Sequence, residues 1–425
     1  MSDVVWIFGL LIVLVFLGLP IFISFIITSI AAVLVLGIPL SVISVKTFGG
    51  IDSFSLMAIP FFILAGNIMM EAEITDKIIK FANALVGRLK GGLGHVSIVS
   101  SMIFAGIQGS GVADASAIGS IMIPSMIKQG YGKDYAAAII GSAATIGPII
   151  PPSIAMIMYA YYTELSVGKL FLGGFVPGVL IGIGLMIVNA ILFRKRKYDF
   201  ELPRKTFKEV LVTTYHSIGA LIMPMIIVFG IVGGIFTPTE SGIAATVYGL
   251  LYGLLISKKL TLKKLGRAIV DAAQTTAGVM IILAVAGVFS NILTRLRFQD
   301  FVINNIALGI PDPYLATLAI MLMILVLGCF IDPSVLIVMF GSTVHAAGMT
   351  LGFDPIHYGV LMVITMLIGA VTPPVGSMLF IACSIAGIPL EASLKPLLPC
   401  ILILFIVCIA ILFFPGLVTL MASIV

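Results

Sequence analysis

The sequence predicts an all-α membrane protein built from two inverted structural repeats. Three observations lead to this prediction: an apolar composition, apolar runs of membrane-spanning length, and the recurrence of the same broken segments in both halves. Of the 425 residues, 60% are hydrophobic and 10% are charged, whereas soluble domains have about 25% charged residues. The mean hydropathy is +1.26. These values exclude a soluble enzyme, a disordered chain and a secreted disulfide-rich domain.

The apolar runs give the expected spans. They fall at 4–18, 20–37, 54–70, 97–128, 135–162, 171–193, 218–236, 240–256, 268–293, 313–349, 357–384 and 397–415. A helix needs roughly 20 residues to cross a bilayer, so we expect about ten transmembrane helices besides the interrupted segments. No basic residue precedes the first run, which predicts a retained span rather than a cleaved signal peptide. A single helix over 4–37 would be about 51 Å long, so we divide it at Gly18-Leu19-Pro20.

Two runs have a polar break near the middle. The run 97–128 is interrupted at Gly106–Gly111, and the run 313–349 is interrupted at Gly328–Ser334. Each arm has roughly 12–17 residues, which is too few to cross a ~30 Å hydrocarbon core. We therefore predict two re-entrant helical hairpins with tips inside the membrane. Irregular backbone is tolerated there only if it is buried in protein or lines a cavity.

Two further runs are broken by proline pairs. The run 135–162 contains Pro151-Pro152, and the run 357–384 contains Pro373-Pro374. Proline removes a backbone donor and clashes with the preceding turn, so each pair is expected to unwind its helix.

The interruptions recur in the same order in both halves, as three spans, a hairpin, a broken span and a plain span. The predicted domains are a first inverted repeat at 1–193, a basic cytoplasmic connector at 194–217 and a second inverted repeat at 218–425. Paired interrupted segments of this kind indicate a secondary transporter with a binding site near the bilayer midplane.

The distribution of basic residues predicts the orientation. If the N-terminus is outside and the hairpins do not cross, all but four of the 23 Lys and Arg residues lie inside. The positive-inside rule favours this arrangement. It places both termini outside and inverts the second half, so the first hairpin enters from the cytoplasm and the second from outside. The four exceptions are Lys46, Lys169, Arg295 and Arg297.

Two features at the membrane surface have alternative interpretations. Arg295 and Arg297 either dock an acidic partner outside the membrane or snorkel at the interface. The amphipathic stretch Glu71–Lys90 is predicted to be an interfacial arm helix that joins a mobile part to a fixed part. The alternative is an ordinary cytoplasmic loop helix.

Two carboxylates lie deep in the apolar segments. Asp114 and Asp332 sit at or just after the hairpin tips, where a charge is costly and therefore a functional candidate. Asp332 either contacts a cation or substrate, or caps a helix that begins at Pro333. We favour the functional role for Asp332. For Asp114 we favour a structural role in the first turn of its arm, where a carboxylate complements the helix dipole.

The hairpin tips and helix breaks supply further candidate ligands. Ser110 lies at the first tip and Ser153 just after the first proline pair, and either hydroxyl can reach a substrate or cap a helix. The second arm of each hairpin starts at its tip, so its N–H groups suit an anionic group. Unwound carbonyl groups suit Na⁺, and each break facing its own hairpin tip would give two related ion sites. The predicted Na⁺ ligands are Ser110, Thr145, Gly147, Gly328, Gly369, Thr372 and Pro373.

Motifs of other function classes are missing from the sequence. A GxxxxGK[ST] motif is absent, which argues against ATP-driven transport by this chain. Ser110 and Asp114 form a weak nucleophile–base pair without a neighbouring His, so we expect no enzyme. The basic residues lie in loops between spans and indicate membrane topology rather than nucleic-acid binding. The four cysteines are interpreted as buried apolar residues, and the four histidines as interfacial residues rather than a proton relay.

Three blocks of sequence resemble a known family. The segments Phe104–Gly119, Ile146–Ser153 and Thr372–Gly376 are similar to the large membrane subunit of TRAP (tripartite ATP-independent periplasmic) transporters, over essentially the whole chain. The resemblance implies Na⁺-coupled import of an organic acid across the bacterial inner membrane by an elevator mechanism, with two or more coupling ions. It also implies a periplasmic substrate-binding protein and a small four-helix membrane subunit on a separate chain. The implied substrate ligands are Ser110, Ser153 and Asp332.

The substrate is a separate question. Overall resemblance favours N-acetylneuraminate (sialic acid). A cavity without deep Arg or Lys also suits a hydroxyl-rich monocarboxylate better than a dicarboxylate. The alternatives are a C4-dicarboxylate TRAP transporter and a stand-alone Na⁺/organic-anion symporter that uses no binding protein. A channel is disfavoured, because the polar breaks come in two pairs at the midplane rather than as stripes along whole helices.

Overall fold

The computed structural model describes residues 2–196 and 207–424, and these ranges contain helices and no β-strand. The α-helices are α1 (Ser2–Phe16), α2 (Ile21–Val35), α3 (Ser41–Gly49), α4 (Ala58–Glu71), α5 (Ile74–Val86), α6 (Gly92–Gln108), α7 (Gly111–Lys128), α8 (Lys133–Ala143), α9 (Ile154–Thr163), α10 (Val167–Lys195), α11 (Phe207–Val232), α12 (Pro238–Leu251), α13 (Leu262–Arg295), α14 (Phe298–Val302), α15 (Pro313–Gly328), α16 (Pro333–Thr350), α17 (Pro355–Gly369), α18 (Ser377–Ala386), α19 (Leu394–Phe413) and α20 (Gly416–Ala422). Short 3₁₀ helices cover Ser55–Met57, Ala144–Ile146 and Leu390–Ser393, and π-helices cover Tyr252–Ile256 and Ile303–Ala307.

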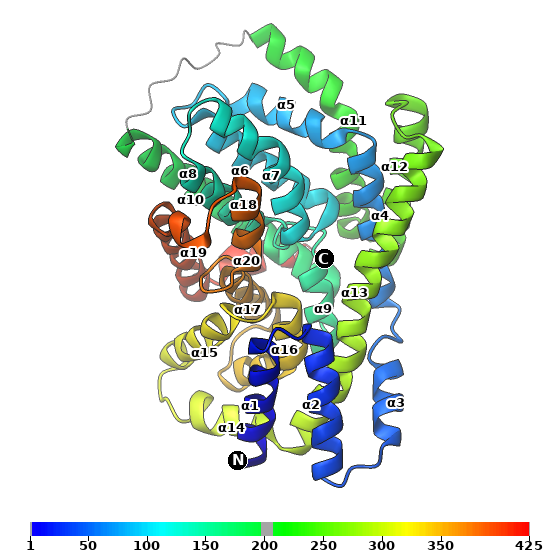
Figure 1. Cartoon of the computed structure of the whole chain (residues 1–425), viewed down its shortest axis with the longest axis vertical. Helices are drawn as coiled ribbons and strands as arrows, with labels where there is room; N and C mark the ends of the chain where they lie inside the picture. Colours follow the sequence, from blue (N-terminus) through cyan, green and yellow to red (C-terminus); the bar gives the residue numbers. More distant parts are fainter. Residues whose placement is uncertain (1, 197–206, 425) are drawn as a thin grey trace.

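The helices are distributed along the long axis of the molecule (Figure 1). Helix α5 lies at one end, and α1, α2, α3 and α14 lie toward the opposite end. The 34-residue α13 runs between these ends and packs against α2, α3 and α4. At 1.5 Å per residue it is about 51 Å long, which is more than the ~30 Å hydrocarbon core requires.

Both halves contain the same order of elements. Helices α1, α2, α3 with α4, and α5 are matched in order by α11, α12, α13 and α14. The hairpin α6–α7 is matched by α15–α16, the broken pair α8–α9 by α17–α18, and α10 by α19. Helices α5 and α14 lie toward opposite ends of the molecule (Figure 1), which is the arrangement that an inverted second half predicts.

Several predicted spans are made of short helices. Within the described ranges, five helical segments are long and apolar enough to cross a membrane: α10, α12 with its π-helix, α13, α16 and α19 with its preceding 3₁₀ turn. Helices α4 and α5 form a sixth candidate, but they bend by 76° at the expected boundary between span and arm. Helices α1 and α2 have 15 residues each, fewer than the roughly 20 that one straight span needs. The number of crossings therefore stays a prediction.

The interrupted segments form as helix pairs. Helices α6 and α7 pack against each other around the break at Gly109-Ser110, and α15 and α16 do so around residues 329–332. Helix α6 begins at Gly92, earlier than the predicted start at 97. The glycine-rich stretch before it resembles a loop, but only Gly91 has a left-handed backbone there (φ 108°). Both Pro-Pro peptide bonds are cis.

The centre of the molecule is formed by the two broken segments. Helix α17 is buried from His357 to Gly369, and the stretch 135–160 is buried without interruption. Helix α16 packs against both α9 and α17. The unwound backbone of the first break thus lies inside protein, as irregular structure at membrane depth must, whereas Pro374 and Val375 of the second break are exposed.

Three regions differ from their predicted boundaries. Helix α11 begins at Phe207, inside the predicted connector 194–217, and residues 197–206 of that connector lie outside the described residues. A second arm, α14 with the following π-helix, was not predicted, because its ten residues are too short to show a clear apolar period. After α19 the chain turns back as α20, which packs on α10.

Candidate functional site

A cavity of about 100 Å³ lies where the two hairpin tips meet α4, α13 and the broken helices. Its polar wall comes from Gln108, Ser110, Thr275, Asp332 and Ser334. The rest of the wall consists of Ile63, Gly109, Gly111, Val112, Ala113, Pro148, Ile154, Ala155, Val279, Pro333, Leu367 and Met378. The predicted residues Ser110 and Asp332, which are far apart in sequence, therefore face one cavity.

The first tip is held against the first helix break. The backbone N–H of Ile154 donates a hydrogen bond to the carbonyl oxygen of Gly109 at 3.3 Å. Gly109 has φ +64°, and a side chain there would overlap the carbonyl of Pro152. A methyl group on Gly147 would lie 3.3 Å from the carbonyl oxygen of Ser110. Glycine at both positions therefore permits close contact between tip and break.

The second tip meets the second break in the same way. The N–H of Val375 donates to the carbonyl oxygen of Cys329 at 3.1 Å. A methyl group on Gly369 would lie 2.5 Å from the Cα of Gly328, so only glycine allows the two backbones to pack there. Each half thus contains one backbone hydrogen bond from a break to its own tip.

Ser110 and Asp332 are both N-cap residues of the second hairpin arms. The Ser110 hydroxyl accepts a hydrogen bond from Ala113 N at 3.5 Å, and the Asp332 carboxylate accepts one from Ser334 N at 2.9 Å. The first residues of α7 and α16 line the cavity, so the positive ends of both helix dipoles face it. Two helix N-termini and two polar side chains converge on one small volume.

Ser153 is close to the cavity but does not line it. It is fully buried and caps α9, accepting a hydrogen bond from Met156 N at 3.1 Å and donating to the carbonyl oxygen of Pro148. Its neighbours Ile154 and Ala155 do line the cavity. The structure therefore places Ser153 in the capping role that was the alternative, and its substrate role stays a prediction.

The predicted Na⁺ ligands fall into two groups. Ser110, Thr145 and Gly147 lie at the first tip and break, and Gly328, Gly369, Thr372 and Pro373 lie at the second. The hydroxyls of Thr145 and Thr372 donate to carbonyl oxygens of Ser142 and Ile368, each at 2.7 Å, which leaves their oxygen lone pairs available to a cation. In the described chain no cluster of three His, Cys, Asp or Glu residues occurs, so the oxygen sources are mainly backbone.

Asp114 lies in the first turn of α7, as expected for a carboxylate that complements the helix dipole, but it does not cap the helix. Its carboxylate is 1% exposed; neither oxygen has a hydrogen bond of ordinary geometry within the described part of the chain, although the Ser101 hydroxyl interacts with it. Its Cβ would lie 3.4 Å from a methyl group on Gly147, which places it beside the first break. Ser110, not Asp114, caps α7. A buried carboxylate without a full set of hydrogen bonds is costly, which favours a bound cation or proton at this position.

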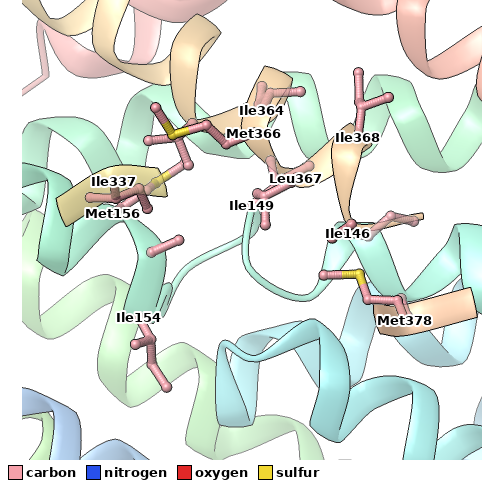
Figure 2. Close-up of a cluster of buried hydrophobic side chains, with 14 of the residues drawn as sticks. Ile146, Ile149, Ile154, Met156, Ile337, Ile364, Met366, Leu367, Ile368 and Met378 are labelled. Carbon is pink, nitrogen blue, oxygen red and sulfur yellow. The ribbon is translucent and has the colours of Figure 1, made fainter. Parts of the chain in front are cut away.

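Apolar side chains surround the first break. Figure 2 shows Ile146 and Ile149 on the unwound loop, with Met378 nearby on α18 and Leu367 on α17. The side chains of Ile146 and Ile149 are buried. A cation at this break would be shielded from water and would depend on protein oxygens for its ligands.

Some residues of the site were not predicted. Thr275 and Val279 line the cavity from α13. They are four residues apart, and Asp271 lies four residues before Thr275, so all three share one face of α13. The apolar residues around them concealed this face in the sequence. Asn67 of α4 accepts a hydrogen bond of 3.2 Å from the Gln108 side-chain amide, and both side chains are buried. Asn67 is a polar residue within the apolar run 54–70, and this feature could have identified it from the sequence.

The two outer arginines lie far along the chain from the site, at the start of the second arm. Arg295 is exposed, and its Nε donates to Asn291 Oδ1 at 3.1 Å. Arg297 is exposed and precedes α14 with φ 52°. No ion pair involving either residue occurs within residues 2–196 and 207–424.

Comparisons with known proteins identify the family. A family model described as "Tripartite ATP-independent periplasmic transporter, DctM component" matches residues 8–417. The C4-dicarboxylate TRAP transporter large permease DctM of Pseudomonas aeruginosa is 36% identical, with 88% of this chain and 87% of that protein covered. The sialic acid TRAP transporter large permease SiaM of Vibrio cholerae is 34% identical, with 95% and 94% covered.

Two further matches extend this result. The isethionate TRAP transporter permease DctMQ of Oleidesulfovibrio alaskensis is 35% identical; 94% of this chain is covered, but only 63% of that longer protein. The crystal structure of the YdaH transporter of Alcanivorax borkumensis is similar in fold, with a TM-score of 0.59, 12% identity and 87% of each chain covered. The fold prediction of an all-α membrane protein is confirmed, and the relatives are permeases rather than enzymes. The chain belongs to the DctM family, the large permeases of tripartite ATP-independent periplasmic transporters.

Proposed function

We propose that this chain couples the inward movement of Na⁺ to the import of an organic acid across the bacterial inner membrane. The observation that carries the proposal is the pair of tip–break contacts around one cavity that contains Ser110 and Asp332. The acid binds between the two hairpin tips. At least one cation binds at each tip–break pair, and both termini lie on the periplasmic side.

The cavity chemistry supports an acid with one charged group. The N-termini of α7 and α16 supply an electropositive surface for a carboxylate. Its wall contains no Lys, Arg or His within the described residues. A second carboxylate would therefore lack a cationic partner, whereas hydroxyl groups can donate to Asp332. We favour N-acetylneuraminate for this reason. The relatives transport C4-dicarboxylates, sialic acid and isethionate, all of them acids, at similar identity.

Sodium coupling is supported by the chemistry of the first break. Asp114 supplies a buried carboxylate whose oxygens have no hydrogen bond of ordinary geometry in the described chain, and Thr145, Gly147 and Ser110 supply oxygens at the same break. Hard cations such as Na⁺ prefer oxygen ligands. At the second break the corresponding oxygens come from Gly328, Gly369, Thr372 and Pro373.

The size of the cavity supports a conformational cycle. A volume of about 100 Å³ corresponds to about three water molecules, which is too small for a nine-carbon acid. The hairpin tips must therefore separate from α4 and α13 when substrate enters. In the proposed elevator, α6–α9 and α15–α18 move together against α1–α4 and α11–α13, with α5 and α14 as arms.

The proposed partners are a periplasmic substrate-binding protein and a small four-helix membrane subunit. Glu73 and Arg297 precede the two arms in the same left-handed conformation (φ 61° and 52°). Glu73 pairs with Lys259 and Lys264, each at 3.4 Å, whereas Arg297 has no such ion pair in the described chain. An acidic group on the binding protein would complete the corresponding pair at the outer arm.

The direct test is uptake into proteoliposomes that contain this chain and its small subunit. Labelled N-acetylneuraminate and succinate are each supplied with a cognate binding protein, present or absent, under Na⁺ or K⁺ gradients. We expect uptake of N-acetylneuraminate only with Na⁺ and the binding protein. Uptake of succinate alone would assign the C4-dicarboxylate alternative. Uptake without the binding protein would assign a stand-alone symporter, and uptake under a proton gradient in K⁺ would refute Na⁺ coupling.

A further inference from the structure

A second polar cavity lies between the helices that move and the helices that stay fixed in the proposed elevator. It has a volume of about 280 Å³ and is lined by Val45, Lys46, Gly49, Gly50, Tyr161, Tyr162, Gly287 and Ser290. These residues come from α3, the end of α9 and the second half of α13. Lys46 is one of the few basic residues that the charge distribution places outside. The cavity therefore lies on the predicted periplasmic side.

This outer cavity is aligned with the central one. Helix α9 lines the central cavity with Ile154 and Ala155 and the outer cavity with Tyr161 and Tyr162, about 9 Å farther along its axis. Helix α13 lines the central cavity with Thr275 and Val279, and the outer one from Gly287 onward, about 12 Å away. The two cavities thus lie at successive levels along α9 and α13, and we call the path between them the α9–α13 seam.

Buried apolar residues occupy the seam between the cavities. Ile157 and Met158 on α9, and Leu283 and Ala286 on α13, lie at intermediate positions and are almost fully buried. Their positions along the two helices fall between the levels of the outer and the central cavity. A movement of α9 along α13 would be needed to join the two.

The outer cavity has the donors that a carboxylate requires. Lys46 contributes an exposed ammonium group, and Ser290 contributes a hydroxyl. The Tyr162 hydroxyl is buried and has no hydrogen-bond partner in the described chain, while the Tyr161 hydroxyl donates to Gly49 O at 3.0 Å. The α3 backbone packs closely on α13, because a methyl group on Gly287 would lie 2.8 Å from the carbonyl oxygen of Lys46. The charge of Asp52 interacts electrostatically with Tyr161, but Asp52 does not line the cavity.

We infer that Lys46, Tyr162 and Ser290 form an outer carboxylate-binding site, which receives the organic acid before it reaches the central cavity. This inference rests on the proposed import of an acid and adds an entry site to it. Lys46 attracts the carboxylate electrostatically, and the hydroxyls replace its water ligands. The site determines how readily an anion enters the seam and leaves the central binding residues unchanged.

The test uses the proteoliposome assay with Lys46→Gln, and Lys169→Gln as the matched control. Lys169 is also exposed and predicted outside, but it lies outside the cavity wall. We expect Lys46→Gln to raise the half-saturating concentration of N-acetylneuraminate or succinate, whichever the wild type imports, about two- to fivefold with an unchanged maximal rate. This difference should shrink as ionic strength rises, because salt screens exposed charges. Lys169→Gln should behave as the wild type.

Two further variants and one binding measurement separate the alternatives. Tyr162→Phe should raise the half-saturating concentration, whereas Asp52→Asn should lower it, because it removes a nearby negative charge. Affinity for the acid-free binding protein should be unchanged in Lys46→Gln. If the wild type imports the acid and Lys46→Gln has the same half-saturating concentration, the entry site is refuted and the proposed function stands. Equal loss of binding-protein affinity would instead assign Lys46 to docking, and absence of acid uptake by the wild type would refute the proposed function itself.

Discussion

Three helices of the second half begin with the same dipeptide, Asp-Pro. Helices α15, α16 and α17 start after Asp312, Asp332 and Asp354, and each carboxylate accepts a hydrogen bond from a backbone N–H two or three residues later. Capping is therefore common to all three aspartates. Only Asp332 also lines the central cavity, which separates a functional role from a structural one.

This comparison gives a prediction for Asp332. Asn caps helices about as well as Asp, so Asp332→Asn should keep the start of α16 intact while removing the charge. We expect uptake to fall at least tenfold with little change in thermal stability. Asp312→Asn, which makes the same change at a cap outside the cavity, should transport normally. Normal uptake by Asp332→Asn, measured in proteoliposomes, would remove this carboxylate from the substrate site.

Asp114 leads to a prediction about the coupling ion. Its carboxylate is buried without a hydrogen bond of ordinary geometry in the described chain, so replacing it by Asn removes a costly buried charge and should not destabilise the fold. If it holds Na⁺, Asp114→Asn should raise the Na⁺ concentration for half-maximal uptake about tenfold or more. Titration of uptake against Na⁺ measures this directly. An unchanged Na⁺ dependence would leave Asp114 as a protonated core residue.

At the scale of elements, one side-chain hydrogen bond joins parts that the elevator proposal separates. Gln108 on α6 donates to Asn67 on α4, and Gly66 gives the space for this contact, since a methyl group there would lie 2.8 Å from Gln108 Cγ. If α6 moves past α4 during transport, this contact must break in every cycle.

A cross-link between the same two positions tests that movement. The double variant Asn67→Cys with Gln108→Cys should bind Hg²⁺ and stop transporting, and a thiol should restore uptake. The four native cysteines are buried, and each single variant controls for reaction with them. Full uptake by a quantitatively bridged protein would show that α4 and α6 stay together, which contradicts the elevator.

The two arms suggest a prediction about partner docking. Arg297 adopts a left-handed backbone that glycine adopts without strain, so Arg297→Gly removes the charge and should not weaken the fold. Charge reversal at Arg295 and Arg297 should raise the half-saturating concentration of binding protein several-fold, and Arg297→Gly should have a smaller effect in the same direction. The assay is uptake against binding-protein concentration. Unaltered coupling in both variants would favour snorkelling.

Some elements were predictable because local chemistry determines them. The breaks at Pro151-Pro152 and Pro373-Pro374 follow from the lost donor and the ring clash, and the tip at Gly109 follows from its glycines. The role of Ser153 was ambiguous, because a cap and a ligand need the same hydroxyl. The surroundings of Asp114 were not predictable, because a position in the first turn shows only proximity to the dipole, whereas its burial depends on packing against the α8–α9 break. Thr275 was missed because its contact with the cavity depends on how α13 packs.

At the scale of the whole molecule, charge and topology are related. The basic residues of α5 and of the α12–α13 connection lie at one end, with Glu71 and Glu73 pairing to Arg267, Lys259 and Lys264 there. The opposite end holds α14 and the two outer arginines (Figure 1). The positive-inside rule assigns the end with more basic residues to the cytoplasmic face. If the end that carries α5 is cytoplasmic, α5 and α14 lie on opposite sides of the membrane.

That arrangement predicts opposite labelling of the two arms. Lys80 on α5 and Asn305 in the π-helix after α14 are both exposed, so a cysteine at either position is accessible to reagents. In intact cells whose outer membrane is permeabilised, a membrane-impermeant maleimide should label Asn305→Cys and spare Lys80→Cys. After solubilisation in detergent both should react, which controls for accessibility, and the buried native cysteines should stay unlabelled. Labelling of both positions from the same side would be incompatible with inverted repeats. It would also move Lys46 and the outer cavity relative to the membrane, because their assignment to the periplasmic side depends on the same orientation.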